Sequence, residues 1–293
     1  MLRLVLFFAT NMAVMLLLSL VFKLLGIQSI FAANGVGLDL NALLVYSAVI
    51  GFAGSFISLL LSKFMAKSSM GVQVIEQPGS ELEGWLLRTV GRLSEQAGIK
   101  MPEVGIFEQA APNAFATGWN KNDALVAVST GLLNSMSRDE IEAVLGHEIS
   151  HVANGDMVTL TLIQGVVNTF VVFLSRVIGY LIDRALSGQN DDRRGPGIGF
   201  WISSMIAQVV LGIFASMIVA WFSRWREFRA DAGGAHLAGR GKMISALRSL
   251  QRGEEAAMPA EMVAFGINTG RMNILFASHP PLEERIAALE NMG

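Results

Sequence analysis

Residues 137–155 read SRDEIEAVLGHEISHVANG, and this stretch predicts the helix around which the rest of the fold is arranged. Ser137 and Glu140 stand three residues apart, a spacing typical of a capping box, in which each side chain bonds the other residue's backbone N–H. His147 and His151 follow, four residues apart. Because residues four apart share a helix face, we expect both imidazole rings to project from one side of this helix.

The two histidines and Glu148 form the pattern H-E-x-x-H. On a helix that ends at Asn154-Gly155, the two imidazoles can bind one zinc ion through nitrogen at about 2.0–2.1 Å. Glu148 lies one step round the helix, where it can reach a water on the metal without binding the metal itself. Such a short motif also occurs by chance, as an incidental pair of surface histidines. Its position on a capped helix, with two of the chain's four histidines, favours a metal site.

The chain contains no cysteine, which excludes disulfides, thiolate zinc sites, iron–sulfur clusters and cysteine nucleophiles. Catalytic zinc sites use three protein ligands and leave one position for water, so the third ligand must be Asp, Glu or His. The extended motif H-E-x-x-H-x-x-G-x-x-H does not fit, because positions 154 and 157 are Asn and Met. The third ligand is therefore expected farther along the chain.

One candidate follows the last long apolar run, where Glu227 and Asp231 stand four residues apart on a predicted helix ending at Gly233-Gly234. A carboxylate at Glu227 can bind the metal, and Asp231 on the same face can orient a metal-bound imidazole. The alternative is an exposed acidic face. Its partners would be Arg224, Arg226 and Arg229.

Composition indicates a membrane protein. Apolar residues make up 52% of the chain and charged residues 16%, against about 25% charged residues in ordinary soluble domains. The net charge of −2 and the lack of a basic cluster argue against a nucleic-acid partner. A membrane-spanning helix needs about 20 apolar residues, which predicts about four transmembrane helices. The four apolar runs are residues 4–25, 40–61, 157–182 and 198–222.

Basic residues predict the orientation of these runs. Lys63 and Lys67 follow the second run, whereas residues 26–39 contain no Lys or Arg. By the positive-inside rule, the amino terminus and the segment after Lys63 face the cytoplasm. The apolar core of a signal peptide has about 7–15 residues. The first run is longer and has no obvious cleavage site, so we expect it to stay in the protein as a membrane span. The third and fourth runs form either two full spans or a hairpin partly covered by protein.

The segments outside the apolar runs indicate a soluble part that mixes helices and strands. Ser80 and Glu83 form a second capping-box pattern, which predicts a helix ending at Gly98. The predicted strands are residues 104–107, 113–117 and 124–129, and further helices are predicted at 242–252 and 282–291.

The predicted fold class is therefore α+β and mostly helical, in an integral membrane protein. The four predicted parts are a transmembrane hairpin (1–67), a soluble part with the two-histidine helix (68–156), a second apolar helix pair (157–222) and a carboxyl-terminal soluble part with the third-ligand candidate (223–293).

Four separated motifs, HEISHVANGD, REFRADAGG, NAFATG and SHPP, together resemble the HtpX-type membrane metallopeptidases, relatives of the CAAX prenyl endopeptidases. The resemblance covers essentially the whole chain. It implies a gluzincin-like protease domain with one Zn²⁺ per chain, in the bacterial inner membrane and with its active site facing the cytoplasm. Misfolded membrane proteins are the implied substrates, in stress response and protein quality control. It also implies that Glu227 is the third zinc ligand and that Asp231 supports the site.

Two further elements follow from the resemblance. The family has an edge strand beside its cleft, and this strand resembles Asn113, Ala114 and Phe115. An edge strand can pair with an extended peptide through main-chain hydrogen bonds. The alternative is an ordinary strand opened by an Asn turn. His279, followed by Arg285, resembles an H-P…R element in which a His or Arg stabilises the oxyanion of the reaction. Without the resemblance, His279 before two prolines is more typical of a turn.

Two other functions compete with a protease. A membrane chaperone or adaptor with a protease-like fold would not cleave its partners, but loss of activity usually removes a ligand or the base, and both are intact here. A transporter predicts charged residues within several spans. Arg176 is the one clear candidate in the apolar runs. The sequence therefore favours a membrane-embedded endopeptidase with polypeptide substrates and a lipid bilayer as its surroundings.

Overall fold

The structure is a computed structural model, and it describes residues 20, 24, 39–187, 196–257 and 279–292. The first predicted span, residues 4–25, lies outside the described residues apart from two positions. The described part is mostly helical, with one small sheet. Its helices are α3 (Leu40–Met70), α4 (Glu81–Gln96), α5 (Thr130–Ser135), α6 (Arg138–Asn154), α7 (Asp156–Ser187), α8 (Ile198–Ala238), α9 (Arg240–Ala257) and α12 (Leu282–Glu290). Its strands are β1 (Gln73–Val74), β2 (Glu103–Phe107), β3 (Ala114–Asn120) and β4 (Asp123–Ser129).

Three helices of the described part, α3, α7 and α8, are long and apolar enough to cross a membrane. They correspond to the second, third and fourth predicted spans, and the predicted fold class of a mostly helical α+β membrane protein is confirmed. The chain divides into two compact units. The first contains Thr161–Val219 and the chain up to Ile57, and the second contains Ser58–Leu160 and Ala220–Gly293.

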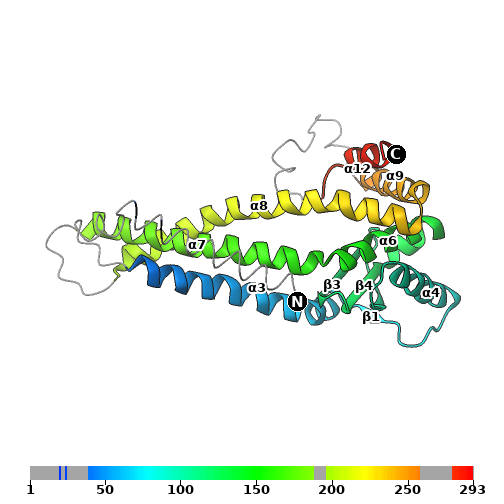
Figure 1. Cartoon of the computed structure of the whole chain (residues 1–293), viewed down its shortest axis with the longest axis horizontal. Helices are drawn as coiled ribbons and strands as arrows, with labels where there is room; N and C mark the ends of the chain where they lie inside the picture. The colour runs from blue at the N-terminus through cyan, green and yellow to red at the C-terminus, as the bar shows by residue number, and fades with distance from the viewer. Residues whose placement is uncertain (1–19, 21–23, 25–38, 188–195, 258–278, 293) are drawn as a thin grey trace. The chain divides into compact units, whose positions relative to one another are not determined.

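In the first unit, small residues bring the apolar helices together. A Cβ atom added at Gly51 of α3 would lie 2.6 Å from the backbone nitrogen of Thr169 on α7. One added at Gly179 of α7 would lie 1.9 Å from Oγ of Ser204 on α8. Close approach at small residues is how helices pack in lipid, where the hydrophobic effect does not drive association. Figure 1 shows the parts of these helices in this unit lying alongside one another.

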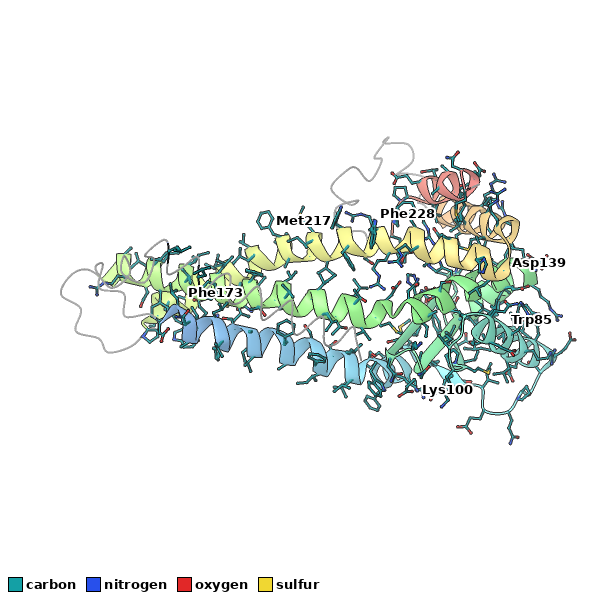
Figure 2. The ribbon with its side chains drawn as sticks, in the orientation of Figure 1. Trp85, Lys100, Asp139, Phe173, Met217 and Phe228 are labelled. Carbon is teal, nitrogen blue, oxygen red and sulfur yellow. The ribbon has the colours of Figure 1, made fainter. Side chains whose placement is uncertain are left out.

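The second unit is built on a four-stranded sheet of order β1-β2-β4-β3. β2 and β4 are parallel, whereas β1 pairs with β2 and β3 pairs with β4 in antiparallel fashion. β3 is therefore an edge strand, and no other described strand pairs with its outer side. The apolar face of α6, including Ile141, Leu145 and Ile149, is fully buried in the same core as the β4 side chains Val126 and Val128. Figure 2 labels Trp85 of α4 in this unit. The guanidinium of Arg138 lies 5.6 Å from the centre of the Trp85 ring.

Local sequence signals place the ends of α6. Ser137 Oγ accepts a hydrogen bond from Glu140 N at 3.3 Å, and Glu140 Oε2 accepts one from Ser137 N at 2.9 Å, which completes the predicted capping box. At its other end, Gly155 adopts the left-handed conformation (φ 64°, ψ 39°) that stops the helix. Only one of the two hydrogen bonds of the capping box predicted at Ser80 forms. Ser80 Oγ accepts from the backbone N of Glu83, but the Glu83 carboxylate accepts from the backbone N of Gly79 instead of that of Ser80.

The predicted strands and the helices at 242–252 and 282–291 match β2, β3, β4, α9 and α12 with shifts of a few residues at their ends. One predicted boundary is wrong. The helix with Glu227 does not end at Gly233-Gly234 but continues to Ala238, and Gly239, with a φ of 104°, follows its end. This helix is also not separate from the fourth apolar run, because both belong to α8.

Glu140 connects α6 to α9. Its Oε1 accepts hydrogen bonds from Ser245 Oγ at 2.8 Å and Ser249 Oγ at 2.6 Å. Burial raises the pKa of this carboxyl, but the hydrogen bonds from Ser249, Ser137 and Ser245 lower it more, to about 2. The ionised form is therefore the one that holds the two helices together.

We expect Glu140→Gln to lower the thermal stability of the detergent-solubilised protein at neutral pH, by on the order of 2 kcal/mol. Because the folded-state pKa is depressed, this contribution is complete above the ordinary carboxyl pKa of 4.5 and is lost as the pH falls toward 2. Thermal unfolding of both proteins across this range measures it. Glu83→Gln, at the equivalent position of α4, is the control. An equal loss of stability at pH 3 and pH 7 would contradict the assignment.

Candidate metal centre

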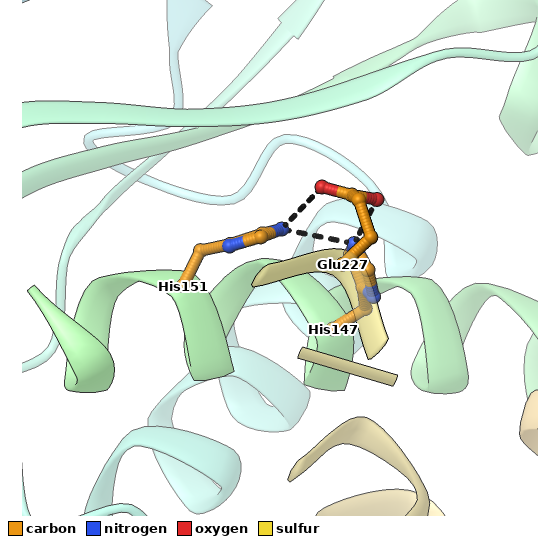
Figure 3. A group of neighbouring side chains, drawn as sticks. All are labelled: His147, His151 and Glu227. Carbon is orange, nitrogen blue, oxygen red and sulfur yellow. Dashed lines mark hydrogen bonds and ion pairs between the residues drawn. The ribbon is translucent and has the colours of Figure 1, made fainter. Parts of the chain in front are cut away.

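The two histidines of α6 and Glu227 of α8 converge on one point in the second unit (Figure 3). Nε2 of His147 lies 3.1 Å from Nε2 of His151. The carboxylate of Glu227 faces both rings, with Oε1 3.2 Å from Nε2 of His151 and Oε2 3.5 Å from Nε2 of His147. The structure thus brings together the three predicted metal ligands.

The spacing of these donor atoms fits a tetrahedral metal ion. Ligand bonds of about 2.0–2.1 Å place neighbouring donors of a tetrahedral site about 3.3–3.4 Å apart. The two ring nitrogens lie 3.1 Å apart, and each lies 3.2 or 3.5 Å from an oxygen of Glu227, a different oxygen for each ring. One donor atom from each of the three residues lies within 4.8 Å of the other two. Two nitrogens and one carboxylate oxygen also leave a fourth position for water or substrate, as in catalytic sites. The residues present therefore fit a zinc-type ion.

Carboxylates contact the outward-facing nitrogen of each ring. Nδ1 of His151 lies 2.6 Å from Oδ2 of Asp156. Nδ1 of His147 lies 2.9 Å from Oδ1 of Asp231, an ion-pair contact without hydrogen-bond geometry. Both carboxylates favour a proton on Nδ1, which leaves the Nε2 lone pairs facing each other and Glu227. A cation between the two Nε2 atoms removes this repulsion.

The charges around the site also call for a cation. Three carboxylates (Glu227, Asp231 and Asp156) and two guanidiniums (Arg226 and Arg285) are almost completely buried there. These five groups together carry one net negative charge, and an isolated buried charge is costly. Burial lowers the pKa of His147, but its contacts with Asp231 and Glu227 raise it more. The pKa of His147 therefore lies above its ordinary value. A bound divalent ion would supply the missing positive charge.

A cavity of about 150 Å³ opens beside the ligands and has room for several water molecules. Glu148, half-buried on α6, lies in its wall. Ala116 of β3 also lines the cavity, so the edge strand borders the site. The remaining lining residues are His151, Asp156, Met157, Leu160, Ser223, Arg226 and Glu227.

His279 and Arg285 are the two residues predicted to stabilise the oxyanion. His279 lies just before α12 and Arg285 lies within it, and their surroundings differ. His279 is exposed, and its Nδ1 lies 2.6 Å from Oε2 of Glu227. Arg285 is buried at the start of α12, where its Nε and Nη2 donate to the two oxygens of Asp231 at 2.8 and 2.6 Å. Its Nη1 lies 3.5 Å from Glu227. Arg285 therefore fixes a carboxylate that faces His147, one of the predicted metal ligands.

The predicted edge-strand residues do not themselves line the cavity. Asn113 precedes β3, and its side chain donates to Oε1 of Gln109 at 3.1 Å. Ala114 packs on the core that contains α6, whereas Phe115 points to the opposite face of the sheet, with its ring 5.4 Å from that of Phe107. The strand reaches the cavity one residue later than predicted.

Asp156 and Arg226 are the site residues that the sequence reasoning missed. Asp156 stands five residues after His151 and directly after the helix-ending Gly155. An acid at this position, at the start of the next helix, could have been considered as a partner of the histidine ring. Arg226 precedes Glu227 in the sequence, where it could equally be the partner of an exposed acidic face. In the structure its side chain is buried.

Two glycines lie where α8 passes close to α6, which carries two of the predicted metal ligands. A Cβ atom at Gly233 would lie 2.4 Å from Oγ of Ser150, and one at Gly234 would lie 3.0 Å from the backbone nitrogen of His147. α8 therefore approaches α6 so closely that a side chain at Gly233 would force Ser150 to shift, and one at Gly234 would be tightly packed. The glycines set the distance between the helices that carry the ligands.

We expect Gly233→Ala to push α8 away from α6, to weaken metal binding and to cost about 1–3 kcal/mol of stability, the usual range for overpacking. Metal affinity and thermal stability of the purified chain measure both effects. Gly241→Ala on α9, where a Cβ meets nothing within 4 Å, is the control. In the Gly233→Ala, Ser150→Gly double variant, the Cβ and Oγ atoms of Ser150, which lie nearest the new methyl group, are absent. Much of the lost metal affinity and stability should therefore return. No response to Gly233→Ala would show that the contact does not set the ligand spacing.

Helices that fit a bilayer, together with a site of two histidines and one glutamate, define the class of membrane metalloproteases. Residues 80–293 match Peptidase family M48. The chain is 66% identical to Protease HtpX of Pseudoalteromonas atlantica (strain T6c / ATCC BAA-1087) over 99% of both chains. It is 60% identical to Protease HtpX of Thioalkalivibrio sulfidiphilus (strain HL-EbGR7), also over 99% of both. The chain belongs to peptidase family M48.

The crystal structure of S. mikatae Ste24p has a similar fold, with a TM-score of 0.63 and 21% sequence identity. The match covers 98% of this chain and 67% of Ste24p. The chain is thus a membrane metalloprotease of an M48 fold, and its substrates are polypeptides. The predicted resemblance to HtpX-type membrane metallopeptidases is confirmed.

Proposed function

We propose that the chain is a zinc-dependent endopeptidase of the bacterial inner membrane that cleaves misfolded or damaged membrane proteins on the cytoplasmic side. The observation that carries this proposal is the convergence of His147, His151 and Glu227, each of which offers one donor atom within 4.8 Å of the others, beside a cavity lined by Glu148. Two imidazoles and one carboxylate are a common ligand set of catalytic zinc. The names of the HtpX relatives support the proteolytic part of the proposal.

In this proposal, zinc supplies polarisation of the scissile carbonyl and a lowered pKa of the attacking water. Glu148 takes a proton from that water during attack and delivers it to the leaving amine. Its half-buried position in the cavity wall supports this role. His279, held through Nδ1 by Glu227, can donate from its other ring nitrogen to the developing oxyanion when it is an imidazolium.

Arg285 takes a different part in the proposed mechanism. Its Nε and Nη2 both serve Asp231, which lies 2.9 Å from Nδ1 of His147. We therefore assign Arg285 as a positioning residue that holds Asp231, and His279 as the group that contacts the oxyanion.

The edge strand supports main-chain recognition of an extended substrate. Ser129 N donates to the carbonyl of Asn113 at 2.8 Å, so this pair belongs to the bonded positions of the antiparallel ladder. Bonded positions alternate with positions whose N–H and C=O point away from the partner strand. Ala114 and Ala116 therefore present these groups to the open edge, where a peptide can add as a further strand. Recognition of this kind depends little on the substrate's side chains, which suits a protease for misfolded proteins.

The cytoplasmic location of the site is supported by the basic end of α3. Lys63 pairs with Glu103 at 2.8 Å and with Asp123 at 2.5 Å, and Lys67 also pairs with Glu103. These contacts join the end of α3 to the sheet of the second unit. By the positive-inside rule this end lies in the cytoplasm, and the sheet and its metal site would lie with it.

Chelation tests the proposed function. The full chain, purified in detergent, should cleave casein, lose this activity after removal of metal with a chelator and regain it when Zn²⁺ is added. A chaperone or adaptor with the same fold would bind casein without producing fragments. Intact casein after incubation with the zinc-loaded chain, while the same preparation binds it, would favour that alternative.

A further inference from the structure

A buried ion pair between Asp156 and Arg226 contacts Nδ1 of His151, the ring nitrogen that faces away from the proposed metal. Asp156, the first residue of α7, places Oδ2 2.6 Å from Nδ1 of His151. Its other oxygen pairs with Nη2 of Arg226 on α8. Arg226 also donates from Nη1 to the backbone carbonyl of Asp156 at 2.5 Å, so the guanidinium holds both the side chain and the backbone of this residue. Asp156 is 8% exposed and Arg226 4%, and burying such a pair is costly unless its geometry is good.

The chain path is built to bring this carboxylate to the ring. α6 ends at Asn154, and Gly155 turns the backbone through a left-handed conformation with a φ of 64°. α7 begins at the next residue, so Asp156 returns to the side of α6 that carries His151, five residues earlier. Glycine is the residue that adopts this conformation most readily.

The other metal-binding histidine has an arrangement of the same kind. His147 contacts Asp231, and Asp231 is held by both Nε and Nη2 of the buried Arg285. Each ligand ring is therefore backed by a buried carboxylate, and each carboxylate is fixed by a buried guanidinium from a different helix. This repetition indicates that the ion pair behind the second ring is not an incidental salt bridge.

We propose that Asp156, held by Arg226, is a positioning residue that holds the ring of His151 through Nδ1 and aims its Nε2 at the metal. This inference rests on the proposed zinc site. A carboxylate partner of a metal-bound imidazole fixes the ring's tautomer and orientation and raises its basicity. Arg226 is adjacent in sequence to Glu227, so the ion pair also ties the start of α7 to the part of α8 that supplies the third ligand.

The experiment measures metal affinity of the full chain in detergent, by competition between the metal-free protein and a fluorescent zinc chelator. Asp156→Ala should weaken Zn²⁺ binding by about 10–100-fold, the usual effect of losing such a partner. Asp156→Asn, which keeps the size and one acceptor oxygen, should lose less, and it carries the test if the alanine variant does not fold. Asp139→Asn, an exposed acid at the start of α6, is the control and should bind as the wild type does.

A double-mutant cycle separates positioning from mere stabilisation of the fold. If Asp156 acts through His151, then Asp156→Ala should weaken Zn²⁺ binding little further once His151→Ala is present. An equal loss in both backgrounds would overturn the proposal. The absorption spectrum of the Co²⁺-substituted Asp156→Asn protein should also differ from that of the wild type, because ring orientation changes the ligand field.

The outcomes distinguish this inference from the proposed function. If the wild type binds Zn²⁺ through its histidines and Asp156→Ala binds it with unchanged affinity, the positioning role is wrong and the zinc site stands. If the wild type binds no metal at His147 and His151, both proposals fall.

Discussion

Glu148→Gln is expected to abolish peptide cleavage while one zinc ion per chain stays bound. The amide keeps the shape of the side chain in the cavity wall but cannot accept a proton from the attacking water. Loss of a general base costs about 10²–10⁴-fold in rate. Cleavage of casein and metal content, measured on the same preparation, check both halves of this expectation.

The matched control is Glu142→Gln, an acid on the same helix that pairs with Arg92 and Lys242. It should leave the cleavage rate close to that of the wild type. Full proteolysis by Glu148→Gln would remove this residue from the mechanism, and loss of the metal from that variant would instead indicate that Glu148 is a ligand.

Glu227→Ala is expected to have the second large effect, which is loss of the metal itself. The carboxylate supplies the oxygen donor opposite the two imidazoles. Losing a residue that only supports a ligand costs about 10–100-fold in metal affinity, so loss of a ligand should exceed that. Chelator competition measures the affinity, and cleavage should fall together with metal content.

Glu148→Gln is the control for this second prediction, because it changes a neighbouring acid of the site without removing a ligand. Excess Zn²⁺ should restore part of the activity of Glu227→Ala if the defect is in binding alone. A variant that keeps one tightly bound zinc ion would show that the third ligand lies elsewhere.

The parts of the site that could be predicted from sequence are those encoded within one helical turn or one cap. His147 and His151 share a face because of their spacing, and Ser137 and Gly155 mark the two ends of their helix. Glu227 could not be located by spacing, because more than 70 residues separate it from the motif; the family resemblance pointed to it.

The errors arose where a residue's role depends on a distant contact. Gly233 and Gly234 predict a helix end when they are considered alone, but here they allow α8 to contact α6. Arg285 could be assigned to the oxyanion or to a support only after its hydrogen bonds to Asp231 were known. Asp156 was passed over because it follows the predicted helix end.

Membrane organisation could be predicted from composition and run length, since about 20 apolar residues are enough to indicate a span. The predicted second span ends at residue 61, whereas α3 extends to Met70 and carries Lys63 and Lys67 into contacts with the sheet. Helix length beyond the apolar run depends on these contacts, which hydropathy does not report.

Titration of the metal-free chain with Zn²⁺, with cleavage followed at each addition, tests whether one zinc ion at the two histidines is responsible for cleavage. The rate should rise in proportion to bound zinc and reach its maximum at one ion per chain. The ion should be absent from a His147→Ala, His151→Ala double variant. Cleavage at the full rate by the metal-free chain, or zinc retained at one per chain by the double variant, would contradict this expectation.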